Sequence, residues 1–125
     1  MVTNGARVYL TGFGPFPGVV HNPTQALVDR IGAAVGPNAG LYCDVLPVGF
    51  QSAAERVARR VSAILPQIVV HLGVATSAHR VRVEIQGVNR IDARVADIDP
   101  ENSLRTAPHD LPCAGISFKR QKLRK

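Results

Sequence analysis

An unbroken apolar run, Ile68-Val69-Val70-His71-Leu72, constrains the fold of this chain more than any other feature of its sequence. The run lies between Pro66 and Gly73, and it has the pattern of a strand that is buried on both faces. Because helices cover both faces of a sheet built from such strands, the rest of the sequence should alternate between strands and helices.

Two other segments are predicted to be strands. Arg7–Thr11 is a short β-rich apolar run that ends at Gly12, and Leu41–Val45 is a second run that leads into Leu46-Pro47-Val48. A helix-forming stretch follows each of them, which is the arrangement of parallel strands joined by right-handed crossovers.

Two helices are predicted between these strands. The first should run from Pro23 to Ala34, because Asn22 can cap it and a proline occupies its first position. The second should begin at the capping box formed by Ser52 and Glu55 and should end at Pro66. The apolar positions expected to face inward are Ala26, Leu27, Ile31 and Ala34 in the first helix, and Ala54, Val57, Ala58, Val61, Ile64 and Leu65 in the second.

The order of these elements predicts an α/β fold, a three-layer α/β/α sandwich with a mostly parallel sheet. After Gly73, apolar residues at 81, 83 and 85 and then at 91, 93 and 95 alternate with polar ones, which predicts a hairpin. No sustained period follows Asp97. The predicted organisation is an α/β domain over residues 1–97 and a divergent basic tail over 98–125, in which no stable element is expected.

The net charge of +6 is concentrated at the end of the chain. Residues 119–125 hold five of the 15 lysines and arginines, so the rest of the chain has ten basic residues against nine acidic ones. The body of the chain therefore lacks the basic face typical of a nucleic-acid-binding domain. All lysines lie in these last seven residues, a composition that indicates sequence foreign to the fold, such as a frameshift or an alternative end.

No apolar run approaches the roughly 18 to 20 residues of a membrane helix, and the start lacks the pattern of a cleavable signal peptide. These features are typical of a cytoplasmic protein. The two cysteines, Cys43 and Cys113, are too few and too far apart for a disulfide framework, and they lack metal-ligand spacing. We therefore expect reduced thiols, no metal and no cofactor.

The segment Thr11-Gly12-Phe13-Gly14-Pro15-Phe16 places two aromatic residues in a loop at the end of the first predicted strand. Ligands bind at the carboxyl ends of strands in open α/β sheets, so Phe13 and Phe16 could line a small apolar pocket. On the residues alone the favoured interpretation is that they fill the space between loop and sheet, because buried aromatic residues usually belong to the core. A phosphate-binding loop is not indicated, because the third glycine of the dinucleotide fingerprint and the lysine of a Walker loop are missing.

Five segments of the chain are informative through their order and spacing. They are Thr11-Gly12-Phe13-Gly14-Pro15-Phe16 with Asn22-Pro23, Leu46-Pro47-Val48, Val69-Val70-His71-Leu72-Gly73-Val74, Glu84 with Asn89, and Ile91-Asp92-Ala93-Arg94. Together they resemble the pyroglutamyl peptidase I family, also called pyrrolidone carboxyl peptidases. The resemblance covers about Arg7 to Asp97.

The resemblance implies a cysteine exopeptidase that removes N-terminal pyroglutamate from peptides, with a Cys nucleophile, a His base and a Glu that orients the His. Glu84 matches that glutamate, and a carboxylate in this role fixes the tautomer of the imidazole and stabilises the imidazolium. Phe13 and Phe16 match the apolar walls around the uncharged pyrrolidone ring. Judged without the resemblance, Glu84 is an exposed strand carboxylate.

The chain also departs from the family. Val74 and Ala78 stand where many bacterial members have Gln and Arg, which puts the contacts of those polar groups in doubt. Family members are considerably longer, and their Cys and His lie in a region for which this chain offers only residues 97–125. Cys113 lacks the sequence around the family nucleophile, and His109 precedes it where the family His follows. We therefore expect a truncated sheet and a chain that is inactive alone.

Two further expectations concern partners. A truncated sheet would leave an uncovered edge through which the chain could associate with itself. As an alternative function, the chain could be a noncatalytic interaction module whose basic tail, Lys119 to Lys125, binds nucleic acid or an acidic partner; such binding should weaken steeply with salt.

Overall fold

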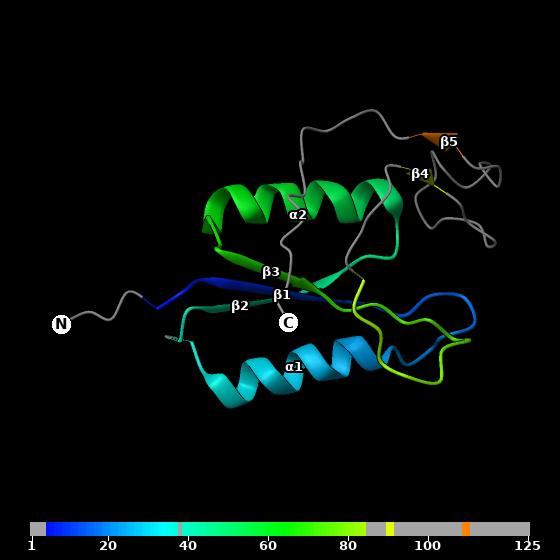
Figure 1. Cartoon of the computed structure of the whole chain (residues 1–125), viewed down its shortest axis with the longest axis horizontal. Coiled ribbons are helices and arrows are strands. Elements are labelled where there is room, and N and C mark those ends of the chain that lie inside the picture. The colour runs from blue at the N-terminus through cyan, green and yellow to red at the C-terminus, as the bar shows by residue number, and fades with distance from the viewer. Residues whose placement is uncertain (1–4, 38, 85–89, 92–108, 111–125) are drawn as a thin grey trace, which may run out of the picture.

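The computed structural model describes residues 5–37, 39–84, 90–91 and 109–110. A parallel sheet with the strand order β2-β1-β3 forms its centre. The strands are β1 (Val8–Phe13), β2 (Leu41–Leu46) and β3 (Ile68–His71), and the helices between them are α1 (Pro23–Val35) and α2 (Phe50–Ile64). The two helices lie on opposite faces of the sheet (Figure 1). The predicted α/β class, parallel sheet and layer order are confirmed.

The middle strand, β1, forms the centre of the core. It pairs with β2 from Val8↔Leu41 to Phe13↔Leu46 and with β3 from Val8↔Ile68 to Thr11↔His71. The buried apolar side chains come from the first two strands and both helices: Tyr9, Leu10, Val28, Leu46 and Ile64. Both neighbours of β1 are present, which is why its burial agrees with its apolar sequence.

Helix α1 begins as predicted but presents a different face to the sheet. Asn22 caps it by accepting a hydrogen bond from the Thr24 N–H, and the chain leaves the helix at Gly36, where φ is 76°. Its buried residues are Thr24 and Val28, and Gly32 continues this stripe against the sulfur of Cys43. The predicted inward set is therefore wrong in large part, since Ala26, Leu27 and Ala34 are exposed and Ile31 is half-buried. Thr24 and Gly32 are small residues on either side of Val28, so the helix can approach the sheet closely at these positions.

Helix α2 starts two residues before the predicted capping box. Its N-cap is Gly49, whose extended backbone is followed by Phe50, and no side chain caps this end. Ser52 therefore lies within the first turn, and the predicted capping box is wrong. The predicted end is confirmed, because Leu65 takes a left-handed conformation with φ of 49° and Pro66 follows. Of the predicted inward positions, Ile64 is buried and Val57 and Val61 are half-buried, whereas Ala54, Ala58 and Leu65 are exposed.

Strand β3 forms where predicted, but the expectation that it is buried on both faces is wrong. All four of its residues are exposed, with fractions of 49%, 40% and 38% for Ile68, Val69 and Val70. Among the described residues the strand is the last of the sheet, while α1 packs on β1 and β2, and α2 packs mainly on β2. The sequence pattern of a central strand is thus found at an edge.

The predicted hairpin after Gly73 is not found in the described residues. Residues 81–84 form no strand, and Val81 and Val83 are almost fully exposed. Instead, β4 (Arg90–Ile91) pairs antiparallel with β5 (His109–Asp110), a segment beyond the predicted domain boundary. Residues 85–89 and 92–95 of the hairpin, the boundary at Asp97, Cys113 and the basic tail lie outside the described residues. Among those that are described, no helix is long and apolar enough to cross a membrane.

Candidate functional site at the carboxyl end of the sheet

The loop after β1 is held in a defined shape by backbone hydrogen bonds. The N–H of Gly14 donates to the carbonyl of Leu46 at the end of β2, at 3.0 Å. Phe16 and Val19 exchange two hydrogen bonds, of 3.1 and 2.8 Å, around a turn in which Gly18 has a φ of 88°. The loop therefore folds back on itself directly beyond the carboxyl ends of β1 and β2.

Phe13, the last residue of β1, and Phe16, in the loop that follows it, are both half-buried, and the stretch from Phe13 to Phe16 is the aromatic loop. Half-burial is compatible with either role considered from the sequence, packing or a pocket wall. The structure thus keeps both rings at the end of the sheet where ligands bind in open α/β folds.

Asn22 and Thr24 lie at the start of α1, are both buried, and hold the loop through hydrogen bonds. The Asn22 side-chain oxygen accepts from the Thr24 N–H at 3.0 Å and from the Thr24 hydroxyl at 2.7 Å, while its amide nitrogen donates to the Gly14 carbonyl at 2.9 Å. The Thr24 hydroxyl oxygen in turn accepts from the Phe13 N–H at 2.9 Å. These bonds explain why the glycine-aromatic segment and Asn22-Pro23 occur together: the second holds the first.

Gly12 allows this approach of helix and strand. A Cβ atom on Gly12 would lie 2.6 Å from the carbonyl oxygen of Thr24, 2.8 Å from its carbon and 3.0 Å from a methyl group of Val28. The first two atoms are backbone atoms of α1, so the helix itself would have to move. The first glycine of the segment is thus explained by the close packing of β1 against α1 and not by phosphate binding.

A second polar contact joins the ends of β1 and β3. Thr11 is fully buried, and its hydroxyl lies 2.7 Å from Nδ1 of His71. Desolvation lowers the pKa of His71, so the ring is neutral at pH 7 even though the residue remains partly exposed at the sheet edge. His71 is thus hydrogen-bonded but not in the core.

Glu84 is not brought to this site by any contact among the described residues. Its side chain is 79% exposed, and its nearest charged partner is Arg82, at 4.0 Å. A carboxylate so placed is solvated, as most exposed strand carboxylates are. Its catalytic role stays a prediction.

Sequence reasoning missed a buried cluster on the other side of the sheet. Asp44 of β2, which is buried, accepts hydrogen bonds from the Tyr9 hydroxyl at 3.0 Å and from two nitrogens of Arg56 at 3.1 and 2.6 Å, and Arg60 lies 3.7 Å away. Burial would raise the pKa of Asp44, but the bonds from Arg56 and Tyr9 and the positive charges outweigh burial and lower it. The one available signal was the spacing of Arg56 and Arg60 on one face of the helix.

The pKa of Tyr9 is raised to about 12, mainly by burial and further by the hydrogen bond to Asp44 and the negative charge of Asp44. The cluster therefore contains a protonated tyrosine and an ionised aspartate at pH 7. It ties β1, β2 and α2 together.

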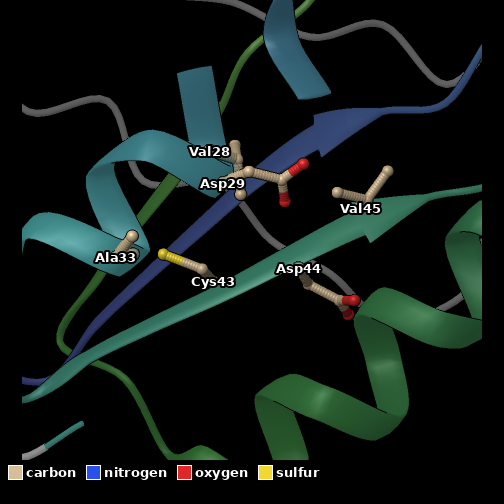
Figure 2. Close-up of a pocket in the computed structure, with 7 residues that line it drawn as sticks. Val28, Asp29, Ala33, Cys43, Asp44 and Val45 are labelled. Atoms are coloured by element: carbon tan, nitrogen blue, oxygen red, sulfur yellow. The ribbon is translucent and has the colours of Figure 1, made fainter. Parts of the chain in front are cut away.

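A hollow of about 260 Å³ lies between α1 and β2. Figure 2 shows Cys43 and Val45 on its β2 side and Val28, Asp29 and Ala33 on its α1 side. Burial and then the charge of Asp29 raise the pKa of Cys43, which keeps the thiol protonated. Cys43 is thus half-buried and poorly suited to be a nucleophile.

A comparison with known protein families identifies the family of this chain. Residues 6–117 match the sequence model of the family described as pyroglutamyl peptidase. The chain belongs to the pyroglutamyl peptidase family. The match includes the aromatic loop, all three parallel strands and Glu84, and it extends past Asp97, where the resemblance noted in the sequence ends.

Individual relatives agree with the family. The chain is 39% identical over 93 residues to the pyrrolidone-carboxylate peptidase of Thermococcus litoralis, and 38% identical over 92 residues to that of Pyrococcus furiosus. These alignments cover 74% and 73% of this chain but 42% and 44% of the relatives. The chain thus spans less than half the length of these two relatives.

Solved structures show the same relation. The pyrrolidone carboxyl peptidase of Thermococcus litoralis superposes with a TM-score of 0.68 at 38% identity, over 75% of this chain and 43% of that one. A Pyrococcus furiosus pyrrolidone carboxyl peptidase mutant (E192Q) gives a TM-score of 0.71 at 32% identity, over 88% and 51%. The chain thus matches about half of each of these solved folds.

Proposed function

We propose that this chain forms the substrate-gripping part of a cysteine peptidase that hydrolyses the bond after an N-terminal pyroglutamyl residue. Phe13 and Phe16 would form the walls of a slot for the pyrrolidone ring, and Glu84 would orient the base. The observation that carries the proposal is the aromatic loop itself. Phe13 ends β1 and Phe16 follows in the loop, both residues are half-buried, and part-buried hydrogen bonds from Phe13 to Thr24 and from Asn22 to Gly14 hold the segment.

The chemistry of the ligand suits such a slot. The pyrrolidone ring is flat and uncharged, so aromatic faces can bury it without leaving an unpaired charge. Its lactam N–H and carbonyl need partners, and the backbone groups of a fixed loop can supply them without a loss of side-chain entropy. A proline ring of the same size carries a positively charged nitrogen, which an apolar slot would exclude.

The described residues provide no nucleophile for the reaction. Their one cysteine, Cys43, has a raised pKa and lies on the α1 side of β2, apart from the aromatic loop. A cysteine nucleophile needs an adjacent base that generates the thiolate, and no hydrogen bond joins Cys43 to a histidine in the described part of the chain. We therefore propose that the chain alone is inactive and that the complete activity requires the remainder of the family fold.

A fluorogenic pyroglutamyl substrate tests this proposal. The purified 125-residue chain should give no turnover above the buffer rate. Turnover that is lost in Cys113→Ala and retained in Cys43→Ala would contradict it, because Cys113 would then be the nucleophile. A protein with Glu84→Gln should behave like the unaltered chain in this assay, and a change in rate would show that a working site is already present.

A further inference from the structure

Arg60 of α2 carries a charge that no group in the described part of the chain fully compensates. Its guanidinium lies 3.7 Å from the carboxylate of Asp44, which is its one acidic partner among the described residues. The Nε atom of Arg60 is buried, yet it has no hydrogen-bond partner there. Buried side-chain nitrogens are nearly always hydrogen-bonded, so this atom needs an explanation.

The bonds of Asp44 explain why Arg60 has no partner. Asp44 points from β2 toward α2 (Figure 2), and its Oδ2 accepts from the Tyr9 hydroxyl at 3.0 Å and from Nε of Arg56 at 3.1 Å. Its Oδ1 accepts from Nη2 of Arg56 at 2.6 Å. Two bonds fill the lone pairs of Oδ2, the oxygen that lies 3.7 Å from Arg60. Arg60 is therefore held by charge and not by a hydrogen bond, and two positive charges face one negative charge.

Arg56 and Arg60 present this excess charge together. Residues four apart lie on the same side of a helix, and both guanidiniums approach the same carboxylate, so they lie side by side. Their side chains are 46% and 43% exposed. Arg56 uses Nε and Nη2 on Asp44, which leaves its Nη1 and the Nη groups of Arg60 without a hydrogen bond in the described part of the chain.

The rest of α2 does not compensate this charge. The helix contains three arginines and one acidic residue, Glu55. The Glu55 carboxylate accepts a hydrogen bond from the Gln51 side chain at 3.0 Å, and it forms no ion pair with Arg56 or Arg60. The two arginines therefore form a half-exposed pair of like charges, which an anion from solution would stabilise.

We propose that Arg56 and Arg60 form a binding site for inorganic phosphate, which bridges the outward Nη groups of both side chains. Phosphate has more than one negative charge near pH 7 and more acceptor oxygens than a carboxylate, so it can bond to two guanidiniums at once. Arginine suits this role because its planar donors match phosphate oxygens. Asp44 already holds Arg56 in place, which lowers the entropy lost on binding. The site does not depend on peptidase activity.

Arg60→Gln and Arg59→Gln are a matched pair that separates a defined site from general charge. Each variant removes one positive charge from α2, but Arg60 lies beside Asp44, whereas Arg59 is exposed and has no ion pair among the described residues. Charge-assisted bonds to two arginines predict a phosphate dissociation constant on the order of 1 mM. Arg60→Gln should raise it about tenfold, and Arg59→Gln should raise it less than about twofold, because exposed charges are screened. Arg60→Lys keeps the charge but loses the planar donors, and it should raise the constant about threefold.

An NMR titration of the full chain with phosphate, at pH 7 and constant ionic strength, gives the readout. The Nε–H signals of Arg56 and Arg60 report on the site itself, which separates it from basic residues elsewhere, such as those from Lys119 to Lys125. Acetate is titrated in the same way and should bind about tenfold more weakly, since it has a single charge and fewer oxygens. Far-UV circular dichroism checks that each variant is folded.

Saturable shifts of both Nε–H signals are expected in the unaltered chain, with weaker binding in Arg60→Gln and nearly unchanged binding in Arg59→Gln. Signals that phosphate does not move would overturn the proposal. Equal weakening in the two Gln variants would overturn it as well, because the attraction would then be general, and so would acetate binding as tight as that of phosphate. If Arg60→Gln does not fold, Arg60→Lys takes its place, and an unchanged dissociation constant in that variant would contradict the site.

Discussion

Gly12→Ala, in β1, should destabilise the chain far more than Gly14→Ala, two residues further on in the loop. The added methyl group at Gly12 would lie 2.6 Å from the Thr24 carbonyl oxygen, whereas at Gly14 its nearest contact, the Leu46 carbonyl oxygen, is 3.8 Å away. The first distance is a backbone collision, and the second is an ordinary van der Waals contact. The two variants therefore differ only in whether α1 must move.

The magnitude follows from these contacts. Overpacking costs about 1–3 kcal/mol, and the upper end applies at Gly12 because backbone atoms cannot rotate away. The lower entropy of the unfolded alanine variant offsets about 0.4–1 kcal/mol, so the net loss should be about 2 kcal/mol. Gly14→Ala should be neutral or gain up to about 1 kcal/mol.

Urea unfolding followed by circular dichroism measures both variants. With an m-value of about 1–1.5 kcal/mol per molar urea for a small domain, Gly12→Ala should lower the midpoint by about 1.3–2 M. Equal midpoints for the two variants would refute the close approach of β1 and α1. So would a Gly14→Ala protein that is the less stable of the two.

Three further predictions concern the buried polar groups. Asn22→Ala should lose about 2 kcal/mol in the same urea experiment, since the cap and the bond to the loop both disappear, while Asn22→Asp should lose less because the cap acceptor remains. The free energy of unfolding should not depend on Tyr9 below pH 10, where tyrosine is protonated in both the folded and the unfolded state. It should fall as the pH rises from 10.0 to about 12, because the folded state keeps the Tyr9 proton to a higher pH than the unfolded state does. Tyr9→Phe should remove this fall. Cys43 should react with a thiol reagent at pH 7.5 more slowly than a free cysteine, because burial raises its pKa.

Each of these has a contrary outcome. Equal stability of Asn22→Ala and Asn22→Asp would show that the cap acceptor contributes nothing. An alkaline transition that is unchanged in Tyr9→Phe would assign it to another group. Reaction of Cys43 at the rate of a small thiol, measured in Cys113→Ala so that one thiol remains, would show that the hollow beside α1 does not shield it.

Local signals predicted the elements of this fold well. Asn22 followed by proline marked the start of α1, and Pro66 marked the end of α2. Each signal depends on residues within one turn of the element it limits, so no knowledge of the tertiary fold was needed. The capping box at Ser52 failed because the backbone at Gly49 already turns into the helix.

Burial was predicted less well, because it depends on neighbours from other parts of the fold. The apolar pattern of β3 is that of a central strand, yet the described chain has no strand beyond it. In α1 the inward stripe includes Thr24 and Gly32, which a search for apolar residues does not select. The side chains that meet at Asp44 come from β1, β2 and α2, so their contact arises only from the packing of these elements.

The candidate site was predicted in the same uneven way. The aromatic loop was recognisable because its glycines, its phenylalanines and Asn22 lie close in sequence. The contacts that hold it, from Asn22 to Gly14 and from Thr24 to Phe13, became visible only in the structure. Glu84 could be assigned only through the family, and its exposed position supplies no local evidence for its role.

The central claim is that the aromatic loop forms a pyroglutamyl slot, and ligand binding observed by NMR tests it most directly. Titration with pyroglutamyl-alanine should shift the ring signals of Phe13 and Phe16, and prolyl-alanine should shift them much less because its ring nitrogen is charged. The shifts should disappear in Phe13→Ala and persist in Val35→Ala. Ring signals that do not move, or that respond equally to the two dipeptides, would contradict the account.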